Sequence, residues 1–154
     1  MIVFRLSKQM YCTDLSGTGA FKVGGRWNSK GTALVYTADS RALSMAEVAV
    51  HIPVGILPKD YFLVSLRIPD DSVTEVEQSN LPPDWNAFPR SFSTQQFGDN
   101  FVKTGKSLVL KVPSAVVPGD FNYLINPLHP LIHQVTLVGE PAPFSFDSRL
   151  FQKI

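Results

Sequence analysis

The chain has 154 residues, 44% of them hydrophobic and 18% charged, with a formal net charge of +1 at pH 7. This size and composition are typical of one globular domain with its own core. The near-neutral charge, without a basic stripe, argues against binding to nucleic acid or to a membrane surface. The single cysteine, Cys12, excludes an internal disulfide framework, and no apolar run reaches the roughly 20 residues that span a bilayer. The N-terminal stretch becomes charged too early for a signal peptide, so we expect a cytoplasmic protein.

The first predicted element is a strand over Ile2 to Leu6, which contains Arg5. An arginine among apolar strand residues either faces solvent from an edge strand or points into a polar pocket, and the pattern leaves both open. A loop-like stretch over residues 7–19 precedes a glycine-rich segment at 24–31. That segment has neither P-loop nor dinucleotide-binding spacing, so its composition favours an ordinary turn over a phosphate site. A short strand is predicted over Ala33 to Thr37.

A helix is predicted to begin near Asp39 or Ser40, since both residue types are good N-caps. Helical spacing then places Leu43, Glu47 and Val50 on one stripe that is expected to face inward. An ionised carboxylate there must be paired or hydrogen-bonded, or it becomes protonated. A structural salt bridge or a solvated helix face would also explain Glu47, but a site acid is the favoured interpretation.

The second half contains strands predicted over Tyr61 to Ile68, Ser107 to Val112 and Val135 to Val138. Residues 79–106 are rich in proline and large aromatics, and we expect an irregular segment packed by its aromatics, with a helix over Ser93 to Lys103.

Prolines and asparagines are dense over residues 122–130, which predicts a loop. In the tail, Phe146, Leu150 and Phe151 are expected to dock on the body. The absence of repeats and linkers predicts a single domain over residues 1–154.

The usual catalytic constellations are missing. His51, His129 and His133 lack metal-ligand spacing, no nucleophile elbow surrounds Ser114, and Glu47 has no evident acidic partner. The remaining acid, arginines, aromatics and hydroxyls suit cleavage of a nucleotide sugar whose leaving group is already cationic. Such a reaction needs no general acid; it needs arginines on phosphates, an aromatic against the base and a carboxylate beside the developing oxocarbenium.

Several elements, in this order, resemble the RES domain family, which is named for an arginine, a glutamate and a serine. They are Gly-Gly-Arg26-Trp-Asn with Tyr36 following, Ala-Glu47 with His51 one turn on, Val-Pro-Ser114 leading to Asn-Tyr-Leu-Ile-Asn-Pro, and the flanking Phe4-Arg5 and Phe-Asp-Ser-Arg-Leu. The resemblance spans nearly the whole chain. It implies an α+β fold similar to ADP-ribosyltransferase toxins: one compact domain with mixed or antiparallel sheets and few helices.

The resemblance further implies a toxin of a bacterial type II toxin–antitoxin pair that depletes NAD⁺ by cleaving its nicotinamide–ribose bond. Phosphorolysis would give nicotinamide and ADP-ribose 1″-phosphate, and hydrolysis is the other route. NAD⁺ is then the substrate and phosphate a co-substrate of the first route, with no prosthetic group and no metal. The implied partner is an antitoxin with a helix-turn-helix region whose C-terminal segment blocks the active site. Two alternatives remain: an ADP-ribosyltransferase that modifies a protein, and a catalytically silent binding module.

Roles follow from the matched positions. Arg26 would hold the pyrophosphate or orient Glu47, and Arg5 would take the other phosphate contact, which favours the pocket over the solvent. Tyr36 would stack against nicotinamide or its ribose, while Glu47 would hydrogen-bond that ribose and stabilise the oxocarbenium. Ser114 would orient the ribose or the glutamate without acting as a nucleophile. The remaining residues expected to bind substrate are Trp27, Asn28 and Asn126.

Overall fold

The computed structural model describes residues 1–153. Its strands are β1 (Ile2–Lys8), β2 (Val35–Ala38), β3 (Tyr61–Arg67), β4 (Val73–Glu75), β5 (Val109–Pro113), β6 (Phe121–Ile125), β7 (Thr136–Leu137) and β8 (Ala142–Phe144). Its α-helices are α1 (Thr18–Val23), α2 (Arg41–Ala49) and α3 (Phe92–Thr104). The strands form one sheet in the order β4-β5-β6-β2-β1-β3-β7, and β8 also pairs with β3. Every described pair is antiparallel except β4 with β5, so the predicted α+β class with mixed pairing and few helices is confirmed.

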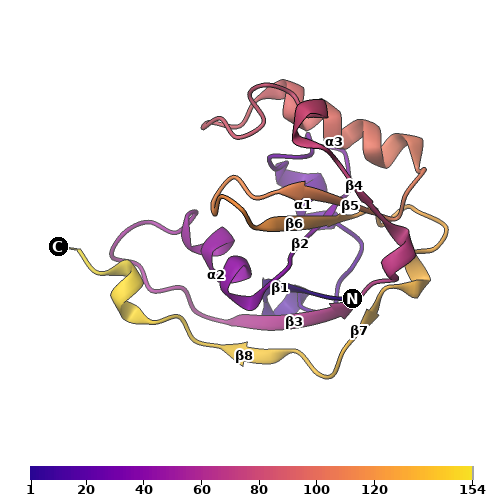
Figure 1. The fold of residues 1–154 in the computed structure, drawn as a ribbon. Coiled ribbons are helices and arrows are strands. Elements are labelled where there is room, and N and C mark those ends of the chain that lie inside the picture. Colours follow the sequence, from indigo (N-terminus) through magenta and orange to yellow (C-terminus); the bar gives the residue numbers. More distant parts are fainter. Residues whose placement is uncertain (154) are drawn as a thin grey trace.

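The sheet is curled, and α2 lies between its β6 part and its β3 part (Figure 1). In this view α3 lies above β5 and β6, and β3 and β8 run along the bottom. Helix α2 packs against β1 and β2, near the middle of the sheet.

Successive side chains of each strand point to opposite faces of the sheet, and each face has its own cluster of buried apolar residues. The paired residues Val109 and Ile125 belong to one apolar cluster, and the neighbouring pair Leu110 and Leu124 belongs to the other. The second cluster contains α3 residues and both tryptophans, and Tyr36 packs against it. This second face is where the glycine-rich segment and α3 meet the sheet.

Helix α2 begins as predicted. The Ser40 side chain accepts a hydrogen bond from the backbone N–H of Leu43 at 3.0 Å, which is N-cap geometry. Leu43 is buried, Glu47 is half-buried and Val50 is exposed, so the inward stripe of the prediction holds at its start and fails at its end.

Helix α3 is also confirmed, capped by Ser91 at its start and by Gly105, with a φ of 59°, at its end. Gly98 lies against the glycine-rich segment so closely that a Cβ built on it would come within 1.7 Å of the Trp27 carbonyl oxygen. Only a residue without a side chain allows this approach.

The prediction of a loop over residues 122–130 is wrong for its first half. Phe121–Ile125 forms β6, a central strand paired with both β2 and β5. The apolar residues Tyr123 and Ile125 fill the core there, and the Asn122 side chain is satisfied by donating to the Thr37 carbonyl at 3.4 Å. The turn-forming residues therefore mark only the end of the strand.

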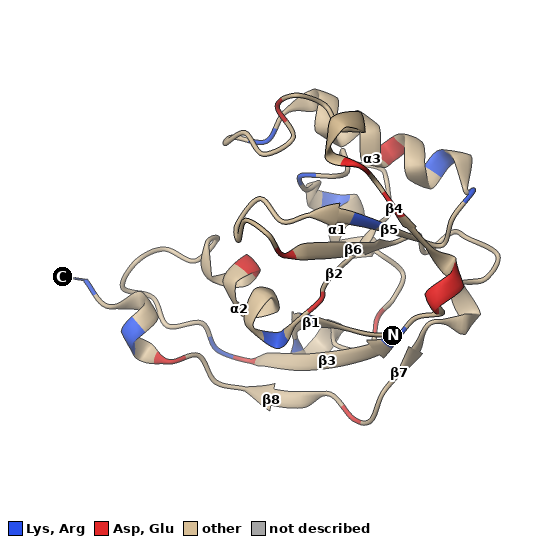
Figure 2. Cartoon of the chain, viewed as in Figure 1, with Lys and Arg blue, Asp and Glu red and all other residues tan. Residues whose placement is uncertain are grey.

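The C-terminal tail docks as expected through Phe146 and Phe151, whose rings meet edge to face, while Leu150 is exposed, contrary to its prediction. In residues 1–153, no helix has the length and apolar character needed to cross a membrane. Basic and acidic residues are interspersed over the elements rather than gathered on one of them (Figure 2).

Candidate active site

The predicted acid and serine meet. Glu47 projects from α2 and Ser114 follows the end of β5, and the Ser114 hydroxyl donates to Glu47 Oε1 at 2.9 Å. Ser114 is buried, and its Oγ accepts hydrogen bonds from the backbone N–H groups of Val116 and Val117, both at 3.1 Å. Because both lone pairs of the hydroxyl are occupied, its hydrogen is directed at the carboxylate. Ser114 therefore orients Glu47 and is not arranged as a nucleophile.

The second carboxylate oxygen, Glu47 Oε2, accepts no hydrogen bond from residues 1–153. A half-buried carboxylate with one oxygen fixed and the other unengaged can accept a hydroxyl of a ligand. It can also face a positive charge that develops during a reaction.

Arg26 lies close enough to Glu47 for the two charges to act on each other. Burial lowers the pKa of Arg26, and the negative charge of Glu47 opposes that shift. No ion pair joins the two side chains within residues 1–153. Instead, Arg26 Nη1 donates to the carbonyls of Trp85 at 2.9 Å and Ala87 at 2.8 Å. This anchoring leaves Nε and Nη2 without a protein acceptor in the described part of the chain.

Tyr36 holds the glycine-rich segment together. Its hydroxyl donates to Asn28 Oδ1 at 2.6 Å and accepts from the Trp27 backbone N–H at 3.0 Å. Burial raises the pKa of the Tyr36 phenol, so the hydroxyl is protonated and able to donate at neutral pH. The same hydroxyl would lie 2.5 Å from a Cβ built on Gly25, which explains the glycine at that position.

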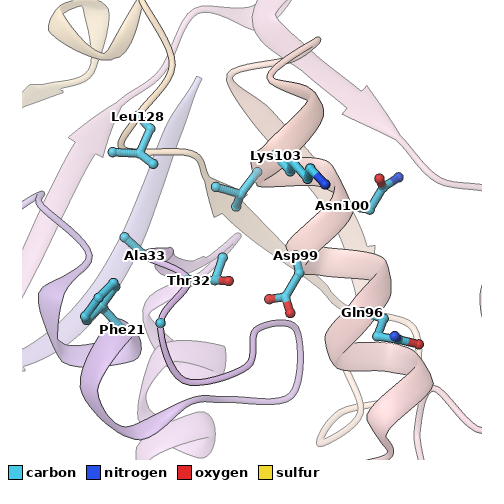
Figure 3. A pocket seen from close by; sticks show the side chains of 10 residues that line it. Phe21, Thr32, Ala33, Gln96, Asp99, Asn100, Lys103 and Leu128 are labelled. Carbon is cyan, nitrogen blue, oxygen red and sulfur yellow. The ribbon is translucent and has the colours of Figure 1, made fainter.

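The site opens into a cleft of about 210 Å³ beside Ser114. One side of the cleft comes from the loop whose carbonyls accept from Arg26, and the other from the turn that contains Ser114. The lining residues are Gln78, Trp85, Asn86, Pro113, Ser114, Ala115, Pro118 and Gly119. A larger hollow of about 710 Å³ lies elsewhere, between α1 and α3, and Figure 3 shows Phe21, Asp99, Lys103 and Leu128 around it. Glu47 and Arg26 line neither space, but Ser114, which donates to Glu47, lines the smaller cleft, and no predicted catalytic residue lines the larger hollow.

Arg5 does not join this group. It pairs with Val64 in the β1–β3 register, and Val64 belongs to the cluster on the opposite face of the sheet from Tyr36. Its guanidinium donates to the carbonyls of Asp14 at 3.0 Å and Tyr11 at 3.2 Å, which are loop acceptors rather than a pocket. The structure thus gives Arg5 a loop-anchoring position.

Three of the expected substrate-binding residues are buried in the scaffold. Trp27 is 2% exposed and stacks on Trp85 with ring centroids 6.4 Å apart. Asn28 is 0% exposed, and its amide donates to the carbonyls of Ala20, Ser29 and Thr32. Asn126 donates to the Val102 carbonyl at 3.2 Å and accepts from the Leu128 N–H at 3.0 Å. All three hold the segments around the site instead of lining it.

Two α3 residues that sequence reasoning missed clamp the segment that carries Arg26. Gln95 Nε2 donates to the carbonyls of Gly25 at 3.0 Å and Asn28 at 3.1 Å, and the Asp99 carboxylate accepts from the Ser29 N–H at 2.9 Å and from its hydroxyl. Their spacing of four residues puts them on one face of the predicted helix. That spacing was the available signal, but nothing in it identified the segment they face.

In residues 1–153, no group of three His, Cys, Asp or Glu side chains lies where it could hold a metal ion. The predicted catalytic residues present one oriented carboxylate and one anchored guanidinium, and a cleft lies beside Ser114.

Comparison with known proteins identifies the family of the chain. The RES domain family model matches residues 2–147. The chain is 38% identical over 155 residues to Toxin Res of Pseudomonas putida, covering 98% of this chain and 100% of that protein. It is 37% identical over 151 residues to Toxin Res of Photorhabdus laumondii subsp. laumondii, covering 97% of each. It is also 43% identical over 120 residues to the Prs ADP-ribosylating toxin of a Sphingobium species, covering 76% of this chain and 74% of that protein.

The fold is shared with a chain in the crystal structure of the M.tuberculosis MbcT-MbcA toxin-antitoxin complex, at a TM-score of 0.69 and 20% identity. The similarity covers 97% of this chain and 86% of that one. With its full-length relatives and a family-model match over residues 2–147, this chain belongs to the RES domain family.

Proposed function

We propose that this protein is the toxin of a toxin–antitoxin pair and that it depletes NAD⁺ by cleaving the nicotinamide–ribose bond. The observation that carries the proposal is the half-buried Glu47 carboxylate, oriented by the buried Ser114 hydroxyl and neighboured by the anchored Arg26. The names of the relatives support a toxin, and one of them is named an ADP-ribosylating toxin.

In the proposed reaction, the bond between C1″ of the ribose and the nicotinamide nitrogen breaks. The electron pair of the bond goes to the nitrogen, which neutralises the cationic nicotinamide, so the leaving group needs no proton. Positive charge then develops on the ribose as an oxocarbenium. Glu47 stabilises that charge through its unengaged Oε2, which also accepts a hydrogen bond from a ribose hydroxyl.

An acceptor then forms a new bond to C1″. Inorganic phosphate gives ADP-ribose 1″-phosphate, and water gives ADP-ribose with release of a proton to solvent. The phosphorolytic and hydrolytic routes share the first step, so they share the roles of Glu47 and Ser114.

Arg26 binds the pyrophosphate of NAD⁺ in this proposal. Its Nη1 is engaged by two carbonyls, which fixes the guanidinium plane, and Nε and Nη2 can then donate to phosphate oxygens. Tyr36 acts by shaping the glycine-rich segment through Asn28 and the Trp27 N–H.

We further propose that the partner is a helix-turn-helix antitoxin that covers the active site. The support is the fold shared with a chain of a toxin-antitoxin complex. Copurification of the toxin with a coexpressed helix-turn-helix antitoxin, and loss of NAD⁺ cleavage in that complex, are the expected results.

A second candidate function is transfer of ADP-ribose to a protein. It is favoured by the 43% identity to the Prs ADP-ribosylating toxin over 76% of this chain. Labelled NAD⁺ incubated with the enzyme and cell lysate separates the two functions: label on a macromolecule supports transfer, and label only in small products supports degradation.

The proposed function is tested by incubating the purified protein, free of antitoxin, with NAD⁺ in phosphate buffer and in phosphate-free buffer. Release of nicotinamide only with phosphate identifies a phosphorylase, and equal release in both buffers identifies a hydrolase. Absence of release in both buffers and with lysate overturns the proposal and leaves a binding module.

A further inference from the structure

The loop that anchors Arg26 carries a second arginine beside it. The two carbonyl acceptors of Arg26 belong to Trp85 and Ala87, and Arg90 follows three residues later. Arg90 Nη2 lies 3.6 Å from the position that a Cβ would take on Gly24, so its guanidinium rests against the glycine-rich segment two residues before Arg26. The loop and the segment thus bring two guanidinium groups to one place.

Neither cation is neutralised there. In residues 1–153, neither Arg26 nor Arg90 forms an ion pair, and the Arg90 side chain makes no hydrogen bond. Asp99, the α3 carboxylate that contacts the segment, accepts instead from Ser29. Two like charges held close without an ion pair raise the free energy of the unliganded site, and a bound anion relieves this cost.

The electrostatics of the site agree with this placement. The positive charge of Arg90 lowers the pKa of Arg26 and opposes the burial-driven rise in the pKa of Tyr36. Glu47 acts on Arg26 as the opposite charge. Arg90 is therefore part of the same electrostatic cluster as the proposed catalytic group, although it lies on an exposed loop.

We infer that Arg90 and Arg26 together form a phosphate-binding pair, with Arg90 as the second guanidinium that the chemistry requires. The ligand class is a phosphate oxyanion, which is either the pyrophosphate of the dinucleotide or an inorganic phosphate co-substrate. This inference rests on the proposed function and deepens it. Arg5, the residue expected to make the second phosphate contact, lies on the opposite face of the sheet and is engaged by loop carbonyls, so Arg90 takes that role. Planar guanidinium groups bind such oxyanions through paired hydrogen bonds.

The test uses Arg90→Gln, with Arg67→Gln as the matched control, since Arg67 is an exposed arginine on β3 with no role in the site. Binding of ADP-ribose by calorimetry reports on the pyrophosphate without requiring turnover. Nicotinamide release, titrated separately with NAD⁺ and with inorganic phosphate, gives a KM for each. Arg90→Lys keeps the charge and removes the planar fork.

We expect Arg90→Gln to raise the Kd of ADP-ribose and the KM of NAD⁺ on the order of tenfold, the scale of one lost charge-assisted hydrogen bond. For Arg90→Lys we expect Kd and KM values between those of the wild type and Arg90→Gln. For Arg67→Gln we expect the wild-type values. A rise in the KM of inorganic phosphate alone would assign the pair to the co-substrate. Unchanged values for ADP-ribose, NAD⁺ and phosphate would overturn the inference.

Failure of the proposed function gives a different pattern. If the wild type releases no nicotinamide, the calorimetric arm still decides: weaker ADP-ribose binding by Arg90→Gln supports the phosphate pair, and wild-type binding overturns it. If the wild type releases nicotinamide and Arg90→Gln matches it in every constant, only the phosphate pair is overturned.

Discussion

Ser114 Oγ donates to Glu47 Oε1 at 2.9 Å while it accepts the backbone N–H groups of Val116 and Val117. The turn after β5 thereby sets the direction of the hydroxyl, and the hydroxyl sets the position of the carboxylate on α2. This one hydrogen bond joins two elements that are far apart in the chain. The arrangement fixes the acid before any substrate arrives.

Ser114→Ala is expected to lower kcat for nicotinamide release on the order of tenfold, because Glu47 loses the hydrogen bond that orients it. The free energy of unfolding should fall by about 1 kcal/mol, because two half-buried N–H groups lose their acceptor. Steady-state kinetics and thermal unfolding measure the two effects. Ser107→Ala removes only an exposed hydroxyl contact with Thr74 and serves as the control. An unchanged kcat in Ser114→Ala would show that the orientation of Glu47 does not matter.

Gly98→Ala is expected to destabilise the protein by about 3 kcal/mol or to prevent folding, since its Cβ would come within 1.7 Å of the Trp27 carbonyl oxygen. Backbone lies on both sides of this contact, so no side chain can move aside. Gly19→Ala on α1 is the matched control: nothing lies within 4 Å of its added Cβ, and alanine should stabilise that helix by about 0.5–1 kcal/mol. Equal melting temperatures for the two variants would contradict the close packing of α3 on the glycine-rich segment.

Much of the fold followed from local patterns in the sequence. The Ser40 cap and the apolar spacing of α2 are signals within one element, and local patterns likewise predict the strand over Tyr61 to Ile68 and the helix over Ser93 to Lys103. The sequence predicts a loop in place of β6 because asparagine and proline are dense over residues 122–130, although most of them follow the strand. Its burial comes from pairing with β2 and β5, which a local pattern does not contain.

The site divides in the same way. The structure joins Ser114 to Glu47 and places Arg26 near that acid, and the catalytic roles that the family resemblance implies for them stay predictions. The burial of Trp27 depends on its packing with Trp85 and Phe97, and the direction of Arg5 depends on which sheet face it occupies, so neither could be read from the residue type. The contribution of Arg90 depends on a loop conformation that has no periodic signature.

Tyr36→Phe is expected to make stability less sensitive to alkaline pH. Burial raises the pKa of Tyr36 in the folded protein, whereas an unfolded tyrosine ionises near pH 10. The contribution of the neutral Tyr36 phenol to the free energy of unfolding is therefore fully present below about pH 10. It is lost as the pH rises further, because ionisation of the tyrosine favours the unfolded chain. Denaturant unfolding between about pH 9 and 11 should give a shallower decline for Tyr36→Phe than for wild type.

The same variant should also lose about 1 kcal/mol at neutral pH, because the hydroxyl joins Asn28 to the Trp27 N–H. Tyr11→Phe is the control, since Tyr11 is 53% exposed. An alkaline decline as steep in Tyr36→Phe as in Tyr11→Phe would contradict the buried, hydrogen-bonded state of the Tyr36 hydroxyl.

The most direct test of the whole account is nicotinamide release from NAD⁺ by purified wild type and by Glu47→Gln, measured side by side with their melting temperatures. The amide keeps the shape of Glu47 and can still accept from Ser114, so the fold should be retained. We expect release by the wild type and a loss of at least about 10²-fold in Glu47→Gln at an unchanged melting temperature. Wild-type release by a folded Glu47→Gln would contradict the account.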